Sequence, residues 1–206
     1  MNTAHCQDKR ETILEAAHKR FAHYGLAKVT MDEIATDLGI SKAALYYYFP
    51  AKEDVFRHVV AAEQQDFAQR IEAIIDGNSG APSKLREYFA QHLNLLGSLL
   101  DLGRASESIK PIMRELFRGF SDTEIGFLTA ILGEGKKHGD FAIESPEKSA
   151  LLVQHILQGL RIRFVKTLKS EEPTGSEIEV YRGDVRQFLE ILLKGISHKH
   201  NGVVKV

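Results

Sequence analysis

Apolar residues recur at helical spacing along almost the whole chain. In residues 8–24, the positions Ile13, Leu14, Ala17, Phe21 and Tyr24 follow one another at intervals of one, three, four and three residues, which marks one face of an α-helix. The alternation of β-branched and polar residues that is typical of strands is absent, and the chain has only five prolines. The pattern therefore predicts an all-α protein.

Capping and turn residues divide this pattern into helices. Gly25 is placed to end the first helix, and Thr30 begins the second, with Glu33 three residues later to complete a capping box. Ser145 and Pro146 mark another helix start, because serine caps and proline suits the first turn. Further helices are expected over residues 51–76, 83–102, 106–110, 112–137 (with a break or bend at 119–122), 146–168 and 178–197, followed by a tail over 198–206.

Residues 30–52 carry the most informative local pattern. They combine a short helix, a turn at Gly39 and a second short helix that Ser41 can cap. Glycine adopts the left-handed conformation at a helix end without steric cost. Two helices joined by such a turn form a helix-turn-helix, whose second helix enters the major groove of DNA.

The second of these helices has side chains that suit DNA. Ser41 and Lys42 can donate hydrogen bonds to bases or phosphates, and small residues at Ala43 and Ala44 let the backbone approach base edges. A helix turns about 100° per residue. We therefore expect Tyr48 to pack partly in the core beside Leu45, while its two preceding tyrosines face DNA.

Two positions flank this helix. Thr30 starts a helix whose free N–H groups can bind phosphate, and Lys52 opens the next helix, where the helix dipole disfavours a cation unless a phosphate lies nearby. The alternatives are a purely capping Thr30 and solvated lysines at 42 and 52. The predicted DNA-binding residues are Thr30, Ser41, Lys42, Ala43, Ala44, Tyr46, Tyr47 and Lys52.

The stretch GISKAALYYYFPAKEDVF, from Gly39 to Phe56, resembles the DNA-binding signature of the tetracycline-repressor (TetR) family. That signature runs Gly, Val/Ile, Ser/Thr, three variable residues, Leu/Ile, Tyr, any residue, His/Tyr, Phe, two residues, Lys, Glu/Asp, any residue, Leu/Phe. Tyr48 stands where His is more common, and Val55 stands where Leu is usual. Residues 13–35 also fit the family's first two helices, so the resemblance covers roughly residues 8–60.

The resemblance implies a two-part architecture. A helix-turn-helix DNA-binding domain over residues 1–52 is joined, by a helix that begins near residue 51, to a helical ligand-binding and dimerisation domain over residues 53–206. It also implies a homodimer that binds a palindromic operator in double-stranded DNA. A small-molecule effector in the C-terminal domain would move the joining helix and change the distance between the two DNA-binding heads.

The last two predicted helices are apolar over a wider face than one domain core needs. The resemblance implies that they pair with their copies as a dimer interface, whereas the alternative is ordinary intradomain core. The predicted interface residues are Leu152, Ile156, Gly159, Leu160, Val185, Phe188, Leu189 and Leu192.

The middle helices supply apolar residues that could line a small-molecule site. Flexible methionine and phenylalanine side chains suit an apolar or aromatic effector, although each residue has ordinary core packing as its alternative. The candidate ligand-binding residues are Leu96, Leu99, Ile112, Met113, Leu116, Phe117, Phe120, Phe127, His155 and Phe164.

Composition limits the remaining classes of function. The 206 residues have a formal charge of −1, and residues 1–60 hold eight basic and eight acidic side chains, so DNA binding must depend on where charges face. The single cysteine, Cys6, excludes a disulfide framework and favours a reducing cytoplasm. Neither a signal peptide nor a membrane-spanning run is expected.

Catalysis and metal binding have little support in the sequence. No nucleophile–base pattern or phosphate-binding loop stands out, and His155 is the only titratable candidate for an enzyme acting on an apolar substrate. His5, His198 and His200 lack the spacing of metal ligands, so we expect no metal and no cofactor. The function expected is a cytoplasmic, ligand-responsive transcriptional repressor; the alternatives are an activator or an effector-independent helical interaction protein of the same fold.

Overall fold

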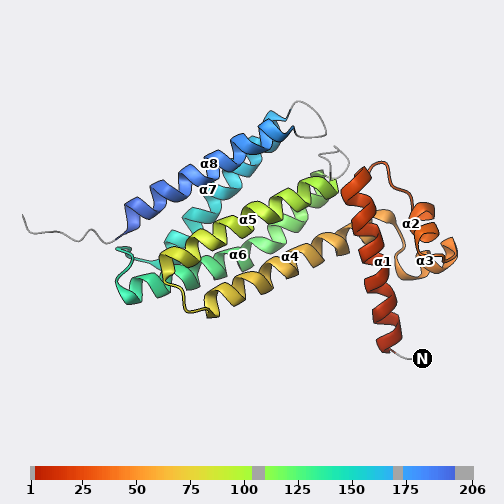
Figure 1. Cartoon of the computed structure of the whole chain (residues 1–206), viewed down its shortest axis with the longest axis horizontal. Coiled ribbons are helices and arrows are strands. Elements are labelled where there is room, and N and C mark those ends of the chain that lie inside the picture. The colour runs from red at the N-terminus through yellow and green to blue at the C-terminus, as the bar shows by residue number, and fades with distance from the viewer. Residues whose placement is uncertain (1–2, 104–109, 169–173, 198–206) are drawn as a thin grey trace, which may run out of the picture. The chain divides into compact units, whose positions relative to one another are not determined.

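Helices make up nearly all of the regular structure in the computed structural model, which describes residues 3–103, 110–168 and 174–197 (Figure 1). The all-α prediction is confirmed. In chain order the helices are α1 (Thr3–Tyr24), α2 (Met31–Asp37), α3 (Lys42–Tyr48), α4 (Lys52–Asp76), α5 (Ala81–Gly103), α6 (Lys110–His138), α7 (Pro146–Thr167) and α8 (Gly175–Ile196).

The chain divides into two compact units. The first comprises residues 1–67, 94–119 and 169–173, and the second comprises residues 68–93, 120–168 and 174–206. Helices α4, α5 and α6 therefore contribute residues to both units. These units are defined by packing, so they do not test the boundary between DNA-binding and C-terminal domains that is expected at residue 52. That boundary stays a prediction.

The first unit contains the core that holds α1, α2 and α3 together. Phe21, Ile34, Leu45 and Phe49 are all fully buried, as the apolar spacing predicts, and the Phe21 ring meets Phe56 of α4 edge to face with centroids 5.7 Å apart. Helices as short as α2 and α3 are marginal in isolation. Their stability therefore depends on this packing.

Local hydrogen bonds determine where α2 and α3 begin. The Thr30 side chain accepts from the Glu33 backbone N–H at 3.3 Å, and the Glu33 carboxylate accepts from the Thr30 backbone N–H at 2.8 Å, which confirms the capping box. Gly39 adopts φ of +62°, and the Ser41 hydroxyl accepts from the Ala44 N–H at 3.1 Å. These bonds complete the helix-turn-helix geometry.

Several predicted boundaries need correction. Helix α6 runs unbroken from Lys110 to His138, so of the break or bend expected at 119–122 the break is wrong. An isolated helical glycine costs only about 1 kcal/mol, and residues such as Phe120 and Leu128 are buried on the same helix. Helix α1 begins at residue 3 rather than 8. Helix α8 begins at residue 175 rather than 178, because Thr174 and Glu177 form a second capping box.

Parts of two predictions fall outside the described residues. The short helix expected over 106–110 lies almost entirely in the gap at 104–109, and the tail expected over 198–206 lies beyond the last described residue. Within the described ranges, none of the helices is both long enough and apolar enough to cross a membrane.

The end of α6 is closed by a tight turn onto its own last residues. The backbone N–H groups of Asp140 and Phe141 donate to the Gly135 carbonyl at 2.8 and 3.1 Å, and the buried Phe141 ring lies against Gly135. A Cβ atom at residue 135 would overlap that ring, and even its Cγ atom would be only 2.9 Å away. Gly135 is therefore needed for close approach of the aromatic side chain.

Gly135→Ala is expected to destabilise the protein by about 1–3 kcal/mol, because the ring has to move out of a packed position. Gly126→Ala provides the matched control in the same helix: nothing lies within 4 Å of its added Cβ, so a gain of up to about 1 kcal/mol is expected. Thermal unfolding followed by circular dichroism measures both variants. Equal effects from the two substitutions would contradict the contact.

Candidate DNA-binding site

The exposed surface of α3 is dominated by two tyrosines. The Tyr47 side chain is 81% exposed and that of Tyr46 is 42% exposed, whereas Tyr48 is half-buried. The Tyr47 and Tyr48 rings meet edge to face at 5.3 Å between centroids. The two tyrosines predicted to face DNA are thus available to a partner, and their contact with DNA stays a prediction.

The start of α3 presents small and charged side chains. Ser41 and Ala43 are exposed and Ala44 is half-buried, so the backbone is accessible there. The Lys42 ammonium lies 2.9 Å from the Asp32 carboxylate of α2, which raises the pKa of Lys42, chiefly through that hydrogen bond. The ammonium is 56% exposed and has three N–H donors, so it can contact a second acceptor beside Asp32.

Lys52 has a structural role that the sequence does not reveal. Its ammonium donates to the carbonyl oxygens of Leu26 and Val29, both at 2.8 Å, and the side chain is half-buried. These bonds tie the first turn of α4 to the segment between α1 and α2. The lysine thus stabilises the head, whether or not it also approaches DNA.

The carboxylates of α2 are all engaged. Arg20 of α1 binds both carboxylate oxygens of Asp37 and lies 3.6 Å from Glu33, while Asp32 pairs with Lys42. The Arg20 hydrogen bond lowers the pKa of Asp37, and hydrogen bonds from Thr30 lower the pKa of Glu33. Two basic side chains therefore offset two of the three negative charges of α2.

Arg10 is a further residue that sequence reasoning missed. Its guanidinium donates to the Tyr48 carbonyl at 3.1 Å and lies over the Phe49 ring, 4.5 Å from the centroid. These contacts close the C-terminal end of α3 against α1. Nothing in the local sequence indicates them, because the partners are 38 or more positions apart.

A chain of hydrogen bonds connects α1 with α4 and α5 inside the first unit. His18 Nε2 lies 2.8 Å from one oxygen of Glu63, and the Ser98 hydroxyl donates to the other oxygen at 2.6 Å. Helix α4 is also bonded to α6, through Arg57 to Glu115 at 2.8 Å. The helix that carries Glu63 is therefore fastened to both its preceding and following neighbours.

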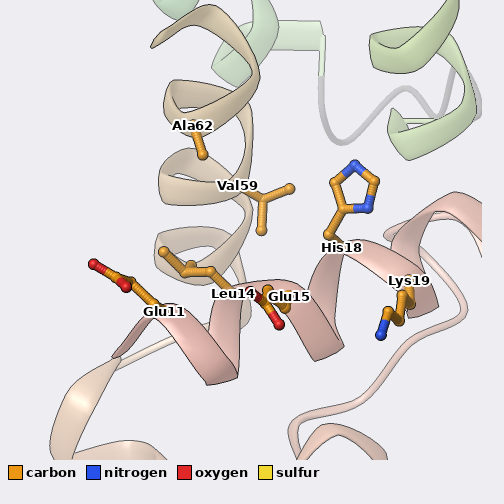
Figure 2. Close-up of a pocket in the computed structure, with 7 residues that line it drawn as sticks. All are labelled: Glu11, Leu14, Glu15, His18, Lys19, Val59 and Ala62. Atoms are coloured by element: carbon orange, nitrogen blue, oxygen red, sulfur yellow. The ribbon is translucent and has the colours of Figure 1, made fainter. Parts of the chain in front are cut away.

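A groove of about 360 Å³ lies along α1 and α4 in the same unit (Figure 2). Its lining has an apolar part, contributed by Leu14, Val59 and Ala62, and a polar part from four residues of α1. The polar residues are Glu11, Glu15, His18 and Lys19. The groove contains none of the residues predicted to bind DNA or effector.

The predicted ligand-binding residues are distributed over both units. Most are buried or half-buried, as expected for either pocket or core, but His155 is exposed on α7. The first unit contains Leu96, Leu99, Ile112, Met113, Leu116 and Phe117, and the second contains Phe120, Phe127, His155 and Phe164. Their role as a ligand site stays a prediction.

The predicted dimer face separates into two classes. Val185 and Leu189 are buried within the chain's own core, whereas Leu152 is 60% exposed and Gly159 is also exposed. The remaining four, Ile156, Leu160, Phe188 and Leu192, are half-buried. Further exposed apolar residues of α7 and α8 that the prediction did not include are Leu151, Ile162, Val180 and Ile191.

In the part of the chain that the structure describes, no group of three or more His, Cys, Asp or Glu side chains is arranged to hold a metal ion. The side chain of Cys6 and the histidines of the C-terminal tail fall outside that part.

Comparisons with known proteins agree with the helix-turn-helix. Residues 13–59 match the family described as bacterial regulatory proteins, tetR family. The crystal structure of a transcriptional regulator from Cytophaga hutchinsonii ATCC 33406 is 33% identical, with a TM-score of 0.86, over 92% of this chain and 99% of that one.

Two curated relatives match over shorter stretches. The fatty acid metabolism regulator protein of Bacillus subtilis (strain 168) is 25% identical over 62% of this chain and 68% of its own length. The HTH-type transcriptional repressor SCO4008 of Streptomyces coelicolor (strain ATCC BAA-471 / A3(2) / M145) is 32% identical over 41% of this chain and 44% of its own length. The latter match therefore spans less than half of either protein.

The family model covers the DNA-binding helices, and the Cytophaga hutchinsonii structure extends the similarity over almost the entire chain. On these grounds the chain belongs to the TetR family of DNA-binding transcriptional regulators.

Proposed function

We propose that this regulator is a homodimeric repressor that binds a palindromic operator and is released from it by a small apolar or aromatic effector. The observation that carries the proposal is the surface of α3, where Tyr46, Tyr47 and Lys42 are exposed on a helix that is capped and packed from behind. A rigid, preorganised helix lowers the entropic cost of fitting the major groove.

The contacts proposed with DNA divide by chemistry. The hydroxyls of Tyr46 and Tyr47 and the ammonium of Lys42 reach phosphates, which position the head, while the exposed backbone near Ala43 approaches base edges. Thr30 lies at the start of α2, and Ser41 and Ala44 lie at the start of α3. The free backbone N–H groups of these two helix starts are proposed to face the same DNA. Lys52 contributes mainly by holding the head together.

Dimerisation is proposed through α7 and α8. Leu152, Ile162, Val180 and Ile191 are apolar side chains that remain largely exposed in the single chain, and exposed apolar patches mark interfaces. Gly159 permits close approach of a second helix. A dimer of this kind presents two heads to the two half-sites of a palindrome.

Repression, rather than activation, is proposed because a curated relative with a matching DNA-binding region is named as a repressor. An apolar effector is supported by the buried Leu and Phe residues of α5 and α6, and by a relative named as a regulator of fatty acid metabolism. A cytoplasmic location is part of the proposal, because double-stranded DNA is the proposed target.

The proposed route from effector to DNA is the hydrogen-bonded chain Ser98–Glu63–His18. Ser98 lies on α5 between the candidate effector residues Leu96 and Leu99, and His18 lies on α1, which packs behind the DNA-reading helices. An effector that shifts α5 would therefore pull on α1 through Glu63. Such a ligand must bind the DNA-free state more tightly to cause release.

Tyr47→Phe should weaken operator binding roughly fivefold, because one hydrogen bond to a phosphate is lost. Lys42→Met should weaken binding and lower the slope of log affinity against log salt concentration by about 0.9, as expected when one phosphate contact disappears. Fluorescence anisotropy with a labelled fragment from upstream of the gene, over a range of salt concentrations, measures both quantities.

Lys148→Met, an exposed lysine near the start of α7, is the matched control and should change neither the affinity nor the salt slope. Unchanged binding in both α3 variants, together with recovery of a bound protein in pull-downs, would favour the helical interaction protein over the regulator.

Leu152→Arg should convert the dimer into a monomer, because it places a charge in the apolar contact between the two copies. The residue is exposed in the single chain, so the protomer should still fold. Sedimentation equilibrium reports the mass, and operator affinity should fall more than tenfold. Ala130→Arg, on an exposed position of α6, should remain dimeric; a dimer in both variants would place the interface elsewhere.

Glu63→Gln should uncouple α5 from the DNA-binding head, because it removes the charge that both His18 and Ser98 contact. Coupling is reciprocal, so operator binding should slow hydrogen exchange of amides near Ser98 in the unaltered protein and not in this variant. Glu72→Gln, exposed on α4, should behave like the unaltered protein. Equal protection in all three proteins would rule out this route.

A further inference from the structure

Polar side chains converge in the interior of the second unit, where an all-apolar core would be expected. They come from four helices and are all at least nine-tenths buried, which is costly unless each polar atom finds a partner. Hydrogen bonding, ring stacking and electrostatic interactions link five of these side chains, which are Tyr88 and His92 of α5, Glu124 of α6, Arg161 of α7 and Tyr181 of α8. The sixth member of this polar cluster is the buried Gln154, which lies seven positions before Arg161 on the same face of α7.

Part of the cluster is internally compensated. His92 Nδ1 lies 3.2 Å from a Glu124 carboxylate oxygen, and the Tyr88 ring stacks on the imidazole with centroids 6.3 Å apart. The charges of Glu124 and Arg161 attract one another across the cluster. The formal charges of Glu124 and Arg161 offset each other.

Three other atoms of the cluster have no hydrogen-bond partner within the described ranges: His92 Nε2, Gln154 Oε1 and the Tyr181 hydroxyl. Burial raises the pKa of Tyr181 to about 12, so its phenol keeps its proton and remains a donor. A neutral His92 whose Nδ1–H faces Glu124 presents a lone pair at Nε2. The three atoms thus provide two acceptors and one group that donates or accepts.

We propose that the polar cluster binds the polar end of the effector and that this end is an uncharged hydroxyl group. A hydroxyl has one proton and two lone pairs, so it can donate to one of the two acceptors, His92 Nε2, while it accepts from the Tyr181 hydroxyl. A carboxylate has no proton to donate, so it would be repelled by the lone pairs of the acceptor atoms of His92 and Gln154. An ammonium would add a second buried cation beside Arg161, which is costly. The assignment of this ligand as the effector rests on the proposed regulatory function.

The residues around the polar cluster suit a ligand whose remaining part is apolar. The Phe164 ring lies 5.0 Å from that of Tyr181 between centroids, and Leu157, on the same face of α7 as Gln154 and Arg161, is buried. Apolar walls with a few aimed polar groups are the usual form of a small-molecule site. The ligand class is therefore an amphiphile with an alcohol or phenol at one end.

The first test needs no ligand. Tyr181→Phe and Gln154→Leu each remove an atom without a partner, so both variants should melt about 2–4 °C higher than the unaltered protein. Gln69→Leu, an exposed glutamine of α4, should leave the melting temperature unchanged. A lower melting temperature for both cluster variants would show that these atoms are already satisfied and would overturn the proposal.

The second test uses matched probes by isothermal titration calorimetry: 1-decanol, decanoate and decylammonium, and 2-naphthol, 2-naphthoate and 2-naphthylmethylammonium. At least one alcohol should bind tenfold or more tightly than both charged probes with the same body. The double variant Tyr181→Phe/Gln154→Leu should lose that preference. Binding of neither alcohol, or preference for a charged probe, would overturn the proposal.

Operator binding by the ligand-free protein is measured separately and tests the regulatory function on its own. An alcohol that binds the cluster and dissociates the operator complex supports both conclusions. An alcohol that binds while the operator complex is unaffected supports the site and contradicts its role as the effector site.

Discussion

The two helices of the helix-turn-helix are too short to be stable alone, and this constraint shapes the packing of the N-terminal helices. Helices α2 and α3 have seven residues each, well below the length at which isolated helices persist in water. Burial of Ile34 and Leu45 in the first unit, where Phe21 is also buried, supplies the stabilisation that the helices lack. Caps at both N-termini and the bonds from Arg10 and Lys52 then set their orientation.

Features whose partners lie close together in sequence could be predicted. The Thr30–Glu33 capping box, the turn at Gly39 and the Ser145 cap all involve residues within a few positions of each other, so their geometry follows from local chemistry. Contacts between distant residues, such as Lys52 with Leu26, could not, because residue type alone does not say which helix faces meet. The break predicted at 119–122 in α6 is wrong because packing of this helix outweighed the weak local preferences of residues such as Gly119.

The same distinction separates the candidate sites. In the head, a specific signature pointed to individual residues, and the exposure of Tyr47 agrees with its predicted position. In α7 and α8, one apolar stripe served two purposes: Val185 and Leu189 are buried in the protomer, while Leu152 is exposed. Buried and exposed residues of this stripe are equally hydrophobic, so the sequence cannot tell them apart. Only the structure shows which of them lie in the core and which at the surface. The buried polar side chains of the second unit, among them Gln154, gave no periodic signal at all.

The ion pair between Lys42 and Asp32 orders a long side chain that would otherwise sample many rotamers. Both groups remain exposed, and an exposed pair of this kind is worth at most about 1 kcal/mol. An ammonium has three N–H donors, so at least one of them stays open to a second acceptor while the aspartate holds the others. The fold thus favours one direction for this charge before any partner arrives.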